Sequence, residues 1–254
     1  MQLSERLTAI AEMVTEGNRL VDVGCDHGYL PVYLILEHKV PSAIAADVRK
    51  GPLSRAQAHI RENGLEAYIE TRLSDGLKEI RAGEGDTLVI AGMGGPLMER
   101  ILTDGVEALS GFRELILQPQ SDVEHFRRFL LESGYVISDE EMVLEDGKFY
   151  PMMRAVPGKG NGCAAWTPEE LAFGKFLLER RHPVLHKYLE RELRVRDEIL
   201  EHLDSAPGAA AQRRKKEVEE ERQQILAALK RYEGKRTDCV AGAELSGRHG
   251  GELG

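Results

Sequence analysis

Residues 20–31 read Leu-Val-Asp-Val-Gly-Cys-Asp-His-Gly-Tyr-Leu-Pro, and this stretch is the strongest indication of the fold. The apolar run at its start predicts a buried strand, the segment from Gly24 to Gly28 predicts a loop, and the residues from Tyr29 to about Lys39 predict a helix. Doubly wound α/β domains open with a strand, a glycine-containing loop and a helix, and a nucleotide-like ligand lies over the carboxyl end of that strand. We therefore expect an α/β domain whose ligand contacts this loop.

The loop carries a carboxylate where dinucleotide-binding loops carry a glycine. In those loops the middle glycine lets the backbone approach a pyrophosphate, whereas here Asp26 lies near that place. A carboxylate repels a phosphate and attracts a cation. S-adenosylmethionine (SAM) has a sulfonium and an ammonium group but no phosphate, so the loop favours SAM over NAD or ATP. The expected SAM contacts in this segment are Asp22, Gly24, Cys25, Asp26, His27 and Gly28.

Further polar positions follow the next two predicted strands. Asp47 ends the strand expected at 42–46, at a distance from the loop where an acidic residue can bind ribose hydroxyls. The segment Ser74-Asp75-Gly76 follows the strand expected at 68–73 and could hold the adenine amine. The alternative is that Gly24 and Gly28 only form turns and that Asp47 only caps the next helix. The expected SAM site is completed by Asp47, Val48, Ser74, Asp75, Gly76, Ala91, Gly92 and Met93.

The loop after the fourth predicted strand, at 87–90, limits the chemistry of the substrate. Enzymes that methylate an exocyclic adenine amine commonly carry Asn/Asp-Pro-Pro-aromatic there, whereas this chain has Gly92-Met93-Gly94-Gly95-Pro96. No side chain of this segment can accept a hydrogen bond from an amine. A ring nitrogen with a free lone pair, such as adenine N1, needs alignment, exclusion of water and tolerance of the developing positive charge. The expected substrate contacts here are Met93, Gly94 and Gly95.

Three residues of the first loop leave alternatives open. Asp26 is the candidate catalytic residue because its charge could stabilise a positively charged methylated ring, but it could equally cap the following helix or hold the SAM ammonium. His27 could contact the substrate, although a structural role in the loop is the favoured interpretation. For Cys25 a packing role in a tight loop is favoured over catalysis.

The remaining pattern predicts a domain of residues 1–158 and a helical appendage. A helix over 3–14 with Ser4 as its N-cap, helices over 53–63, 97–102 and 122–133, and a strand at 115–117 are expected. Two β-like runs, 135–144 and 149–156, flank an Asp-Gly turn and predict an antiparallel hairpin. A sheet that ends in such a hairpin is typical of Rossmann-like, class I SAM-dependent methyltransferases.

Beyond a linker at 159–167, two helices are expected to form an antiparallel coiled-coil hairpin over 168–232. Thr167-Pro168-Glu169-Glu170 predicts a helix start, and an apolar stripe continues along that helix to Leu203. Ser205-Ala206-Pro207-Gly208 breaks the pattern before the second helix. Residues 233–254 are polar and glycine-rich, so we expect a disordered tail.

Charge is distributed unevenly along the chain. Residues 175–236 carry 16 Lys and Arg against 12 Asp and Glu, a net of +4. Since the whole chain carries −9 and residues 237–254 carry −2, the remaining residues 1–174 carry −11. The appendage could therefore bind RNA phosphates, and the alternative is a solvated helix surface with ion pairs four residues apart. The candidate phosphate contacts are Arg213, Arg214, Lys215 and Lys216.

The composition argues against several classes of protein. No apolar run approaches the roughly 20 residues of a membrane span, and the first residues predict an amphipathic helix rather than a signal peptide. The three cysteines, at 25, 163 and 239, lack the spacing of a metal site or a disulfide framework. We therefore expect a cytoplasmic protein without a metal or a membrane partner. The pattern does not indicate an oligomeric state.

The sequence resembles a known family at several separate motifs. Over roughly residues 1–232 it is similar to the bacterial tRNA (adenine-22-N1)-methyltransferases, the TrmK family. The resemblance implies a class I SAM-dependent fold, methylation of N1 of a D-loop adenine in tRNA, and a helical domain that engages the tRNA. The motifs that carry it are Asp22-Val23-Gly24-Cys25-Asp26-His27-Gly28-Tyr29-Leu30-Pro31, Ala45-Ala46-Asp47-Val48, Ser74-Asp75-Gly76-Leu77, Ile90-Ala91-Gly92-Met93-Gly94-Gly95 and Leu117-Gln118-Pro119.

The resemblance has departures and competing interpretations. Family members often have Ser and Ala where this chain has Cys25 and Gly28, and both replacements are small. One alternative is a SAM-dependent methyltransferase of a small molecule or a protein, with the helical hairpin as a dimerisation element. A second alternative is a SAM-binding RNA adaptor without enzymatic activity.

Overall fold

The computed structural model describes residues 1–158, 166–204 and 208–233, and its centre is a seven-stranded sheet. The strand order is β3-β2-β1-β4-β5-β7-β6. β1 to β5 are parallel, and β7 is antiparallel to both of its neighbours. The strands are β1 (Leu20–Val23), β2 (Ala43–Asp47), β3 (Ile69–Leu73), β4 (Thr87–Met93), β5 (Glu114–Pro119), β6 (Tyr135–Glu145) and β7 (Lys148–Pro157).

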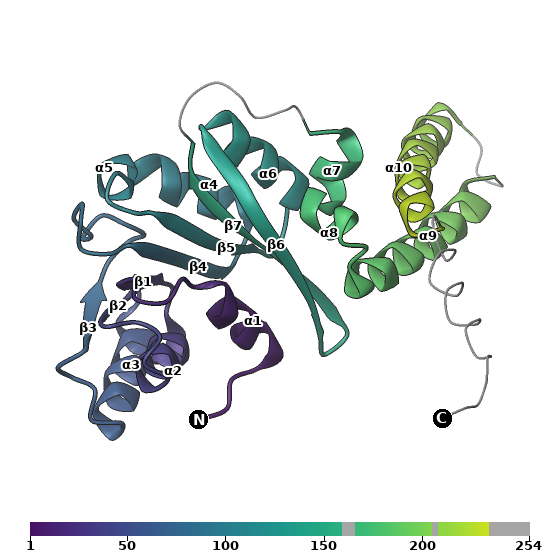
Figure 1. The fold of residues 1–254 in the computed structure, drawn as a ribbon. Helices are drawn as coiled ribbons and strands as arrows, with labels where there is room; N and C mark the ends of the chain where they lie inside the picture. The colour runs from purple at the N-terminus through teal and green to yellow at the C-terminus, as the bar shows by residue number, and fades with distance from the viewer. Residues whose placement is uncertain (159–165, 205–207, 234–254) are drawn as a thin grey trace, which may run out of the picture.

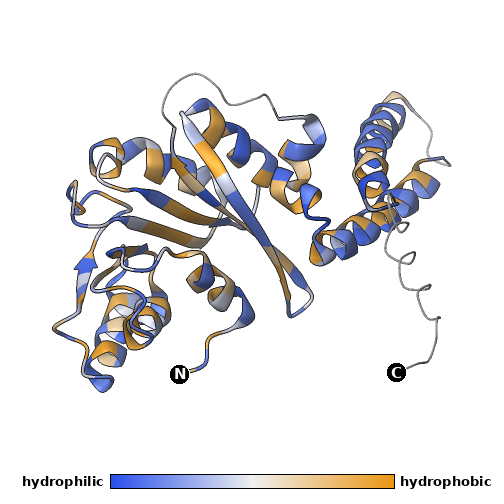
Figure 2. Cartoon of the chain, viewed as in Figure 1, coloured by the Kyte–Doolittle hydropathy of each residue, from blue (hydrophilic) through white to orange (hydrophobic). Residues whose placement is uncertain are grey.

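Helices cover both faces of this sheet (Figure 1). On one face α1 (Glu5–Met13), α2 (Tyr29–Leu36) and α3 (Lys50–Glu62) bury apolar side chains against the strands. On the other face a second apolar core joins the sheet to α4 (Gly95–Asp104), α5 (Val106–Leu109) and α6 (Val123–Glu132). The central strands β4 and β5 are largely apolar in Figure 2, because a parallel sheet between two helical layers is buried on both faces.

The strand order places a topological switch point at β1. The chain leaves β1 toward β2 and β3 on one side and returns to β4 on the other side. In open α/β sheets, ligands bind outside the carboxyl ends of the strands at such a point. The loop after β1, which includes a short 3₁₀ turn at Asp26–Gly28, lies at this point.

Most of the predicted elements of the sheet domain are confirmed, with shifted ends. Ser4 caps α1 by accepting a hydrogen bond from the Leu7 backbone N–H at 3.3 Å. The Asp146-Gly147 hairpin forms with both residues at positive φ. The expected end of the fourth strand at residue 90 is wrong: β4 continues to Met93 because residues 91 and 93 pair with β5. α5 was not predicted.

The expectation of one helix from Pro168 to Leu203 is wrong. The capping box at Thr167 and Glu170 does start a helix, but three helices follow: α7 (Pro168–Phe173), α8 (Lys175–Glu179) and α9 (Pro183–Asp204). Gly174 breaks the first two apart with a φ of +93°, and a Cβ there would lie 2.7 Å from Glu140 Oε1. Close packing against β6 therefore interrupts a helix that the local pattern would continue.

A buried ion pair attaches α7 and α8 to the sheet domain. Arg127 Nε on α6 lies 2.8 Å from Glu140 Oε1 on β6, and these side chains are 1% and 0% exposed. Arg127 also donates to the carbonyls of Leu171 and Ala172 at 2.9 and 3.0 Å. The second Glu140 oxygen accepts from the Phe176 backbone N–H at 3.1 Å. These contacts fix both short helices against β6.

The last two helices, α9 and α10 (Ala209–Glu233), pack against each other in opposite directions. Arg196 pairs with Glu221 at 2.9 Å and Arg222 with Asp197 at 2.6 Å. Near the other end, the Tyr232 hydroxyl donates to a carbonyl at the start of α9 at 3.1 Å.

Three predictions concern residues outside this description: most of the linker (159–165), most of the interhelical break (205–207) and the tail (234–254). Among the residues that are described, no helix combines the length and apolar character that a membrane crossing requires.

Candidate active site at the carboxyl edge of the sheet

The loop after β1 is held tightly between β2 and the end of β4. The backbone N–H groups of Gly24 and Cys25 donate to the Ala46 carbonyl at 2.8 and 3.1 Å. Gly24 has a φ of +81°, and a Cβ there would lie 2.3 Å from the Met93 Cε atom. Met93 therefore lies directly over Gly24, so the first loop contacts the end of β4.

A cavity of about 380 Å³, which we call the β1 cavity, opens at this loop. Five of the predicted site residues line it, and α1, α2 and the first residues of the chain form the rest of its wall. The predicted residues that line it are Asp22, Gly24, Cys25, Asp26 and Ala91. The residues that sequence reasoning did not include are Gln2, Leu3, Ser4, Arg6, Leu7, Tyr29 and Leu30.

Asp22 is a buried carboxylate without an ion pair among the described residues. Its side chain is removed from solvent at the end of β1. Burial and, to a lesser extent, the charge of Asp47 raise the pKa of Asp22 to about 7. A cation in the β1 cavity would stabilise the ionised form of this carboxylate.

Asp47 lies beside Asp22 at the carboxyl end of the adjacent strand. It is buried, and its Oδ1 accepts a hydrogen bond from the Arg49 backbone N–H at 2.8 Å. The neighbouring Val48 is 58% exposed. Asp47 ends β2 and Val48 follows it at the carboxyl edge of the sheet, although neither lines the β1 cavity.

Asp26 and His27 share Arg55 as a partner, and His27 Nε2 lies 3.7 Å from Asp26 Oδ1. Asp26 lines the β1 cavity, and its Oδ1 lies 3.0 Å from Arg55 Nη2 on α3. His27 has a φ of 55°, and its ring stacks on Tyr29 at 5.3 Å and accepts from Arg55 Nε at 3.0 Å. His27 does not line the cavity, and its structural role remains a prediction.

Of the other two loop residues, Cys25 is part of the cavity wall and Gly28 lies beside it. Gly28 packs against α3, where a Cβ would be 3.3 Å from Ala56 Cβ. Cys25 is buried, and burial raises the pKa of its thiol, which disfavours the reactive thiolate. The described residues include no cluster of His, Cys, Asp and Glu able to hold a metal ion.

The side chains of Ser74 and Asp75, in the segment after β3, already form hydrogen bonds or ion pairs with nearby residues. The buried Ser74 hydroxyl donates to the Gly76 carbonyl at 2.8 Å and accepts from the Glu79 backbone N–H at 3.2 Å. Asp75 pairs with Lys78 at 2.6 Å, and this hydrogen bond holds the pKa of Asp75 below its usual value. Neither side chain lines the β1 cavity.

The end of β4 is organised by Gln118 on β5, for which the sequence predicted no site role. Its Oε1 accepts from the Gly92 backbone N–H and from Arg6 Nη1, both at 3.1 Å. Gly94 caps α4, and the Gly95 backbone N–H donates to the Ser121 carbonyl at 3.2 Å. Arg6 therefore enters the site from α1, and sequence reasoning missed it because a single Arg in an amphipathic helix carries no signal.

Most cations of the basic cluster on α10 are paired with acidic side chains. Arg214 pairs with Glu217 at 2.9 Å, Lys215 with Asp204 at 2.6 Å, and Lys216 lies 3.8 Å from Glu220. Arg213 forms no ion pair within the described part of the chain. Three of the four predicted phosphate contacts thus also fit the alternative of a solvated helix surface with local pairs.

The fold and this site define a class of protein. A parallel sheet with a terminal antiparallel hairpin carries a glycine loop and two buried carboxylates at its switch point. The family described as methyltransferase domain matches residues 3–153, which is more than half of the chain. The class is therefore the Rossmann-like α/β methyltransferases.

Individual relatives narrow this class. The tRNA (adenine(22)-N(1))-methyltransferase of Bacillus subtilis (strain 168) is 37% identical over 210 residues, which cover 81% of this chain and 87% of that protein. The crystal structure of the B. subtilis m1A22 tRNA methyltransferase TrmK has a TM-score of 0.80 and 33% identity, and the match covers 90% of this chain and 99% of that chain. Streptococcus pneumoniae Sp1610 in complex with S-adenosyl-L-methionine has a TM-score of 0.80 and 31% identity over 90% of this chain and 100% of that chain. The chain belongs to the tRNA (adenine(22)-N(1))-methyltransferase family.

Proposed function

We propose that this protein methylates N1 of adenine 22 in tRNA, with SAM as the methyl donor. The observation that carries the proposal is the likeness to the B. subtilis enzyme over 210 residues. The predicted methyltransferase domain has only 158 residues, so this likeness must extend into the C-terminal helices. A likeness confined to the sheet domain would support methyl transfer in general, whereas one that includes the appendage supports the same substrate.

The β1 cavity fits SAM by its donor set. Asp22 is a buried carboxylate that lacks an ion pair among the described residues, and a cationic ligand would satisfy it. We infer that Asp22, Asp26 and the backbone of residues 24–28 hold the methionine end of SAM. Asp47 and Val48 are then placed for its ribose, and Ser74, Asp75, Gly76 and residues 91–93 for its adenine. When bound, SAM supplies an electrophilic methyl group.

The residues of this chain position the base and exclude water. Adenine N1 has a free lone pair, so alignment rather than a general base is needed. We infer that Met93, Gly94 and Gly95 form the surface against which the base lies, because Met93 already covers Gly24 of the SAM loop. Asp26 is our candidate for stabilising the positive charge of the product ring, and its pair with Arg55 keeps its carboxylate at the cavity wall.

We further propose that the tRNA is held by the helices beyond the sheet domain. The opposed packing of α9 and α10 supports an antiparallel coiled-coil hairpin within residues 168–232. The residues from 175 to 236 carry +4 against −11 in residues 1–174. RNA phosphates therefore favour the helices over the acidic sheet domain.

The test is incubation of bulk tRNA with the protein and SAM, followed by mass spectrometry of the nucleosides. We expect 1-methyladenosine at position 22 and little product on a duplex of the same sequence, since N1 lies on the Watson–Crick edge. Methylation of a protein or a small molecule with none of tRNA would support the first alternative. SAM binding without turnover on any tRNA would support the adaptor.

A further inference from the structure

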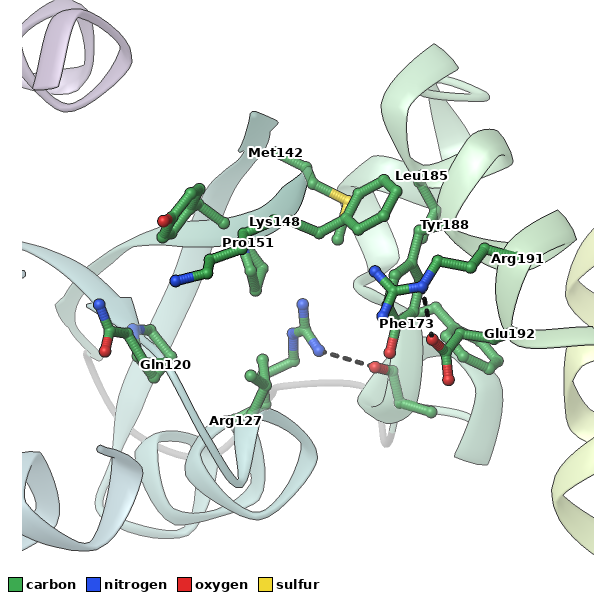
Figure 3. A pocket seen from close by; sticks show the side chains of 15 residues that line it. Gln120, Arg127, Met142, Lys148, Pro151, Phe173, Leu185, Tyr188, Arg191 and Glu192 are labelled. Atoms are coloured by element: carbon green, nitrogen blue, oxygen red, sulfur yellow. Dashed lines mark hydrogen bonds and ion pairs between the residues drawn. The ribbon is translucent and has the colours of Figure 1, made fainter. Parts of the chain in front are cut away.

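A second cavity, of about 440 Å³, lies where the β6–β7 hairpin meets the C-terminal helices. We call it the hairpin cavity (Figure 3). Its wall combines the end of β5, the first turns of α6, part of β6, the start of β7, α7 and α9. β7 is antiparallel to β5, so its first residues extend beyond the carboxyl edge of the sheet. The cavity is therefore on the edge that carries the proposed active site, and its volume is within the range of ligand pockets.

Flat aromatic and guanidinium groups gather where the start of β7 meets α7 and α9. Phe149 and Tyr188 meet edge to face, with ring centroids 5.2 Å apart. The Arg191 guanidinium lies 5.5 Å from the centroid of the Phe149 ring. Figure 3 shows Phe173, Tyr188 and Arg191 on the side of the α7 and α9 helices, facing the open space. Unstacked RNA bases are bound on aromatic rings and guanidinium planes of this kind.

The opposite side presents polar groups that are available to a ligand. Lys148 and Gln120 extend into the space from the side of the sheet (Figure 3). Lys148 forms no ion pair with the residues that the structure describes, and it is exposed. Arg127 at the base is compensated by Glu140 at 2.8 Å and by carbonyl groups of α7, so its role is structural. One ammonium group is thus left to meet an anion such as a phosphate.

The two cavities are separated by a thin wall. Gln120, which lines the hairpin cavity, donates its backbone N–H to the Met93 carbonyl at 2.8 Å. Arg6 lines the β1 cavity, and its guanidinium lies 5.4 Å from the ring centroid of Tyr150, which lines the hairpin cavity. A nucleotide at the loop after β4 would consequently have its chain neighbour at the mouth of the hairpin cavity.

We propose that the hairpin cavity binds the unpaired base of a nucleotide adjacent to the target adenosine, with the ring of Phe149 as a stacking surface and Lys148 on its phosphate. This inference rests on the proposed function, since it assigns a second subsite to the same RNA. Drawing the target adenine out of its stack also removes the stacking partner of its neighbour. The cavity replaces that partner.

The experiment is a thermodynamic cycle between the protein ring and the RNA base. The full-length protein and its Phe149→Leu variant are assayed on tRNA with an abasic residue on the 5′ or the 3′ side of the target adenosine. For the wild type, we expect one of the two abasic substrates to lose about 5- to 150-fold in kcat/KM, the range for stacking one base. For Phe149→Leu, the same abasic substrate should lose less than about 2-fold, because the interaction is already absent.

Control variants separate this effect from folding. Tyr68→Leu removes an aromatic ring that is 52% exposed at the start of β3, and it should keep the full abasic loss. SAM affinity by calorimetry should be unchanged in all variants. Lys148→Ala, at an exposed position, should weaken tRNA binding about equally on intact and abasic substrates.

Each outcome decides the inference. Equal abasic losses in the wild type and Phe149→Leu, or no loss at either position in the wild type, would overturn it while leaving tRNA methylation intact. If the wild type methylates no tRNA, the proposed function fails and this subsite with it.

Discussion

The β1 cavity and the hairpin cavity lie on the same edge of the sheet, but they are built differently. The β1 cavity takes its carboxylates and glycine from one segment, residues 22–26, with further wall from neighbouring elements. The hairpin cavity collects side chains from residues 119–192, which belong to six separate elements. The proposed methyl-donor chemistry is thus local in the sequence, whereas the proposed recognition of RNA depends on packing between distant segments.

The largest expected effect is on the packing that forms the hairpin cavity. Glu140→Gln leaves Arg127 buried without its counter-charge, and breaking such a pair costs about 3–5 kcal/mol of unfolding free energy. Denaturant unfolding measures this loss. The matched control is Glu124→Gln, which removes an exposed pair with Arg128 worth only ~0.3–0.5 kcal/mol. Equal stabilities of the two variants would show that the buried pair does not hold α7 and α8 on the sheet.

The β1 side of the comparison is tested by Asp47→Ala. Charge-assisted hydrogen bonds to ribose hydroxyls contribute about 1.5–3 kcal/mol each, so SAM affinity should fall by roughly 10-fold or more. Calorimetry measures the affinity, and thermal unfolding shows that the domain still folds. Asp75→Ala should lower SAM affinity less than Asp47→Ala does, because Asp75 is already paired with Lys78. Unchanged SAM affinity in folded Asp47→Ala would remove this residue from the site.

Loss of a buried polar group usually lowers the free energy of unfolding, whereas Asp22→Asn should raise it at pH 8. The pKa of Asp22 is raised to about 7, against about 3.9 in an unfolded chain. The folded state therefore retains a proton that the unfolded state has released, and the free energy of unfolding falls as the pH rises from about 4 through 7. Thermal unfolding at pH 8 should show the variant more stable than the wild type, by ~2–4 °C for each kcal/mol. Below pH 4 the difference should vanish.

Two measurements check the Asp22 prediction. The variant should bind SAM more weakly despite its greater stability, because the carboxylate charge is removed. Asp86→Asn should instead be less stable than the wild type at pH 8, since its hydrogen bond with Arg19 holds the pKa of Asp86 below its usual value. A stability profile of Asp22→Asn that parallels the wild type across this pH range would contradict the assignment.

The smallest effect is expected from the basic cluster on α10. Reversing the charge at residues 213–216 should make the salt dependence of tRNA binding shallower by about 0.7–0.9 for each phosphate that the protein no longer neutralises. Because three of these four cations are already paired with acidic side chains, the slope should change little. Filter binding across a salt series measures it. A collapse of tRNA affinity would show that this cluster, rather than the hairpin cavity, is the main site of RNA binding.

Much of the sheet domain could be predicted because its signals are short-range. Short, mostly apolar strands, the Asp-Gly turn and the Ser4 cap each depend on neighbours in the chain. The end of β4 was misjudged because pairing with β5 outweighed the glycine signal. The break at Gly174 could not be predicted, because the carboxylate that requires a glycine there belongs to β6.

The candidate site divides in the same way. Asp22, Gly24 and Asp26 were identifiable from one loop, and the structure places all three in one cavity wall. Arg6 and Gln118 were not, because their hydrogen bond joins residues 112 positions apart. The stacking surface of the hairpin cavity was missed for the same reason.

The order of the strands along the chain, the glycine loop after the first strand and the acidic residue that favours a cationic ligand are properties of the sequence alone. Each of these follows from side-chain periodicity or from backbone preferences over a few residues. Tertiary packing determines which charges are neutralised, such as Arg127 by Glu140, and which remain available, such as Lys148. Burial and pairing depend on distances between elements, and a linear pattern does not contain those distances.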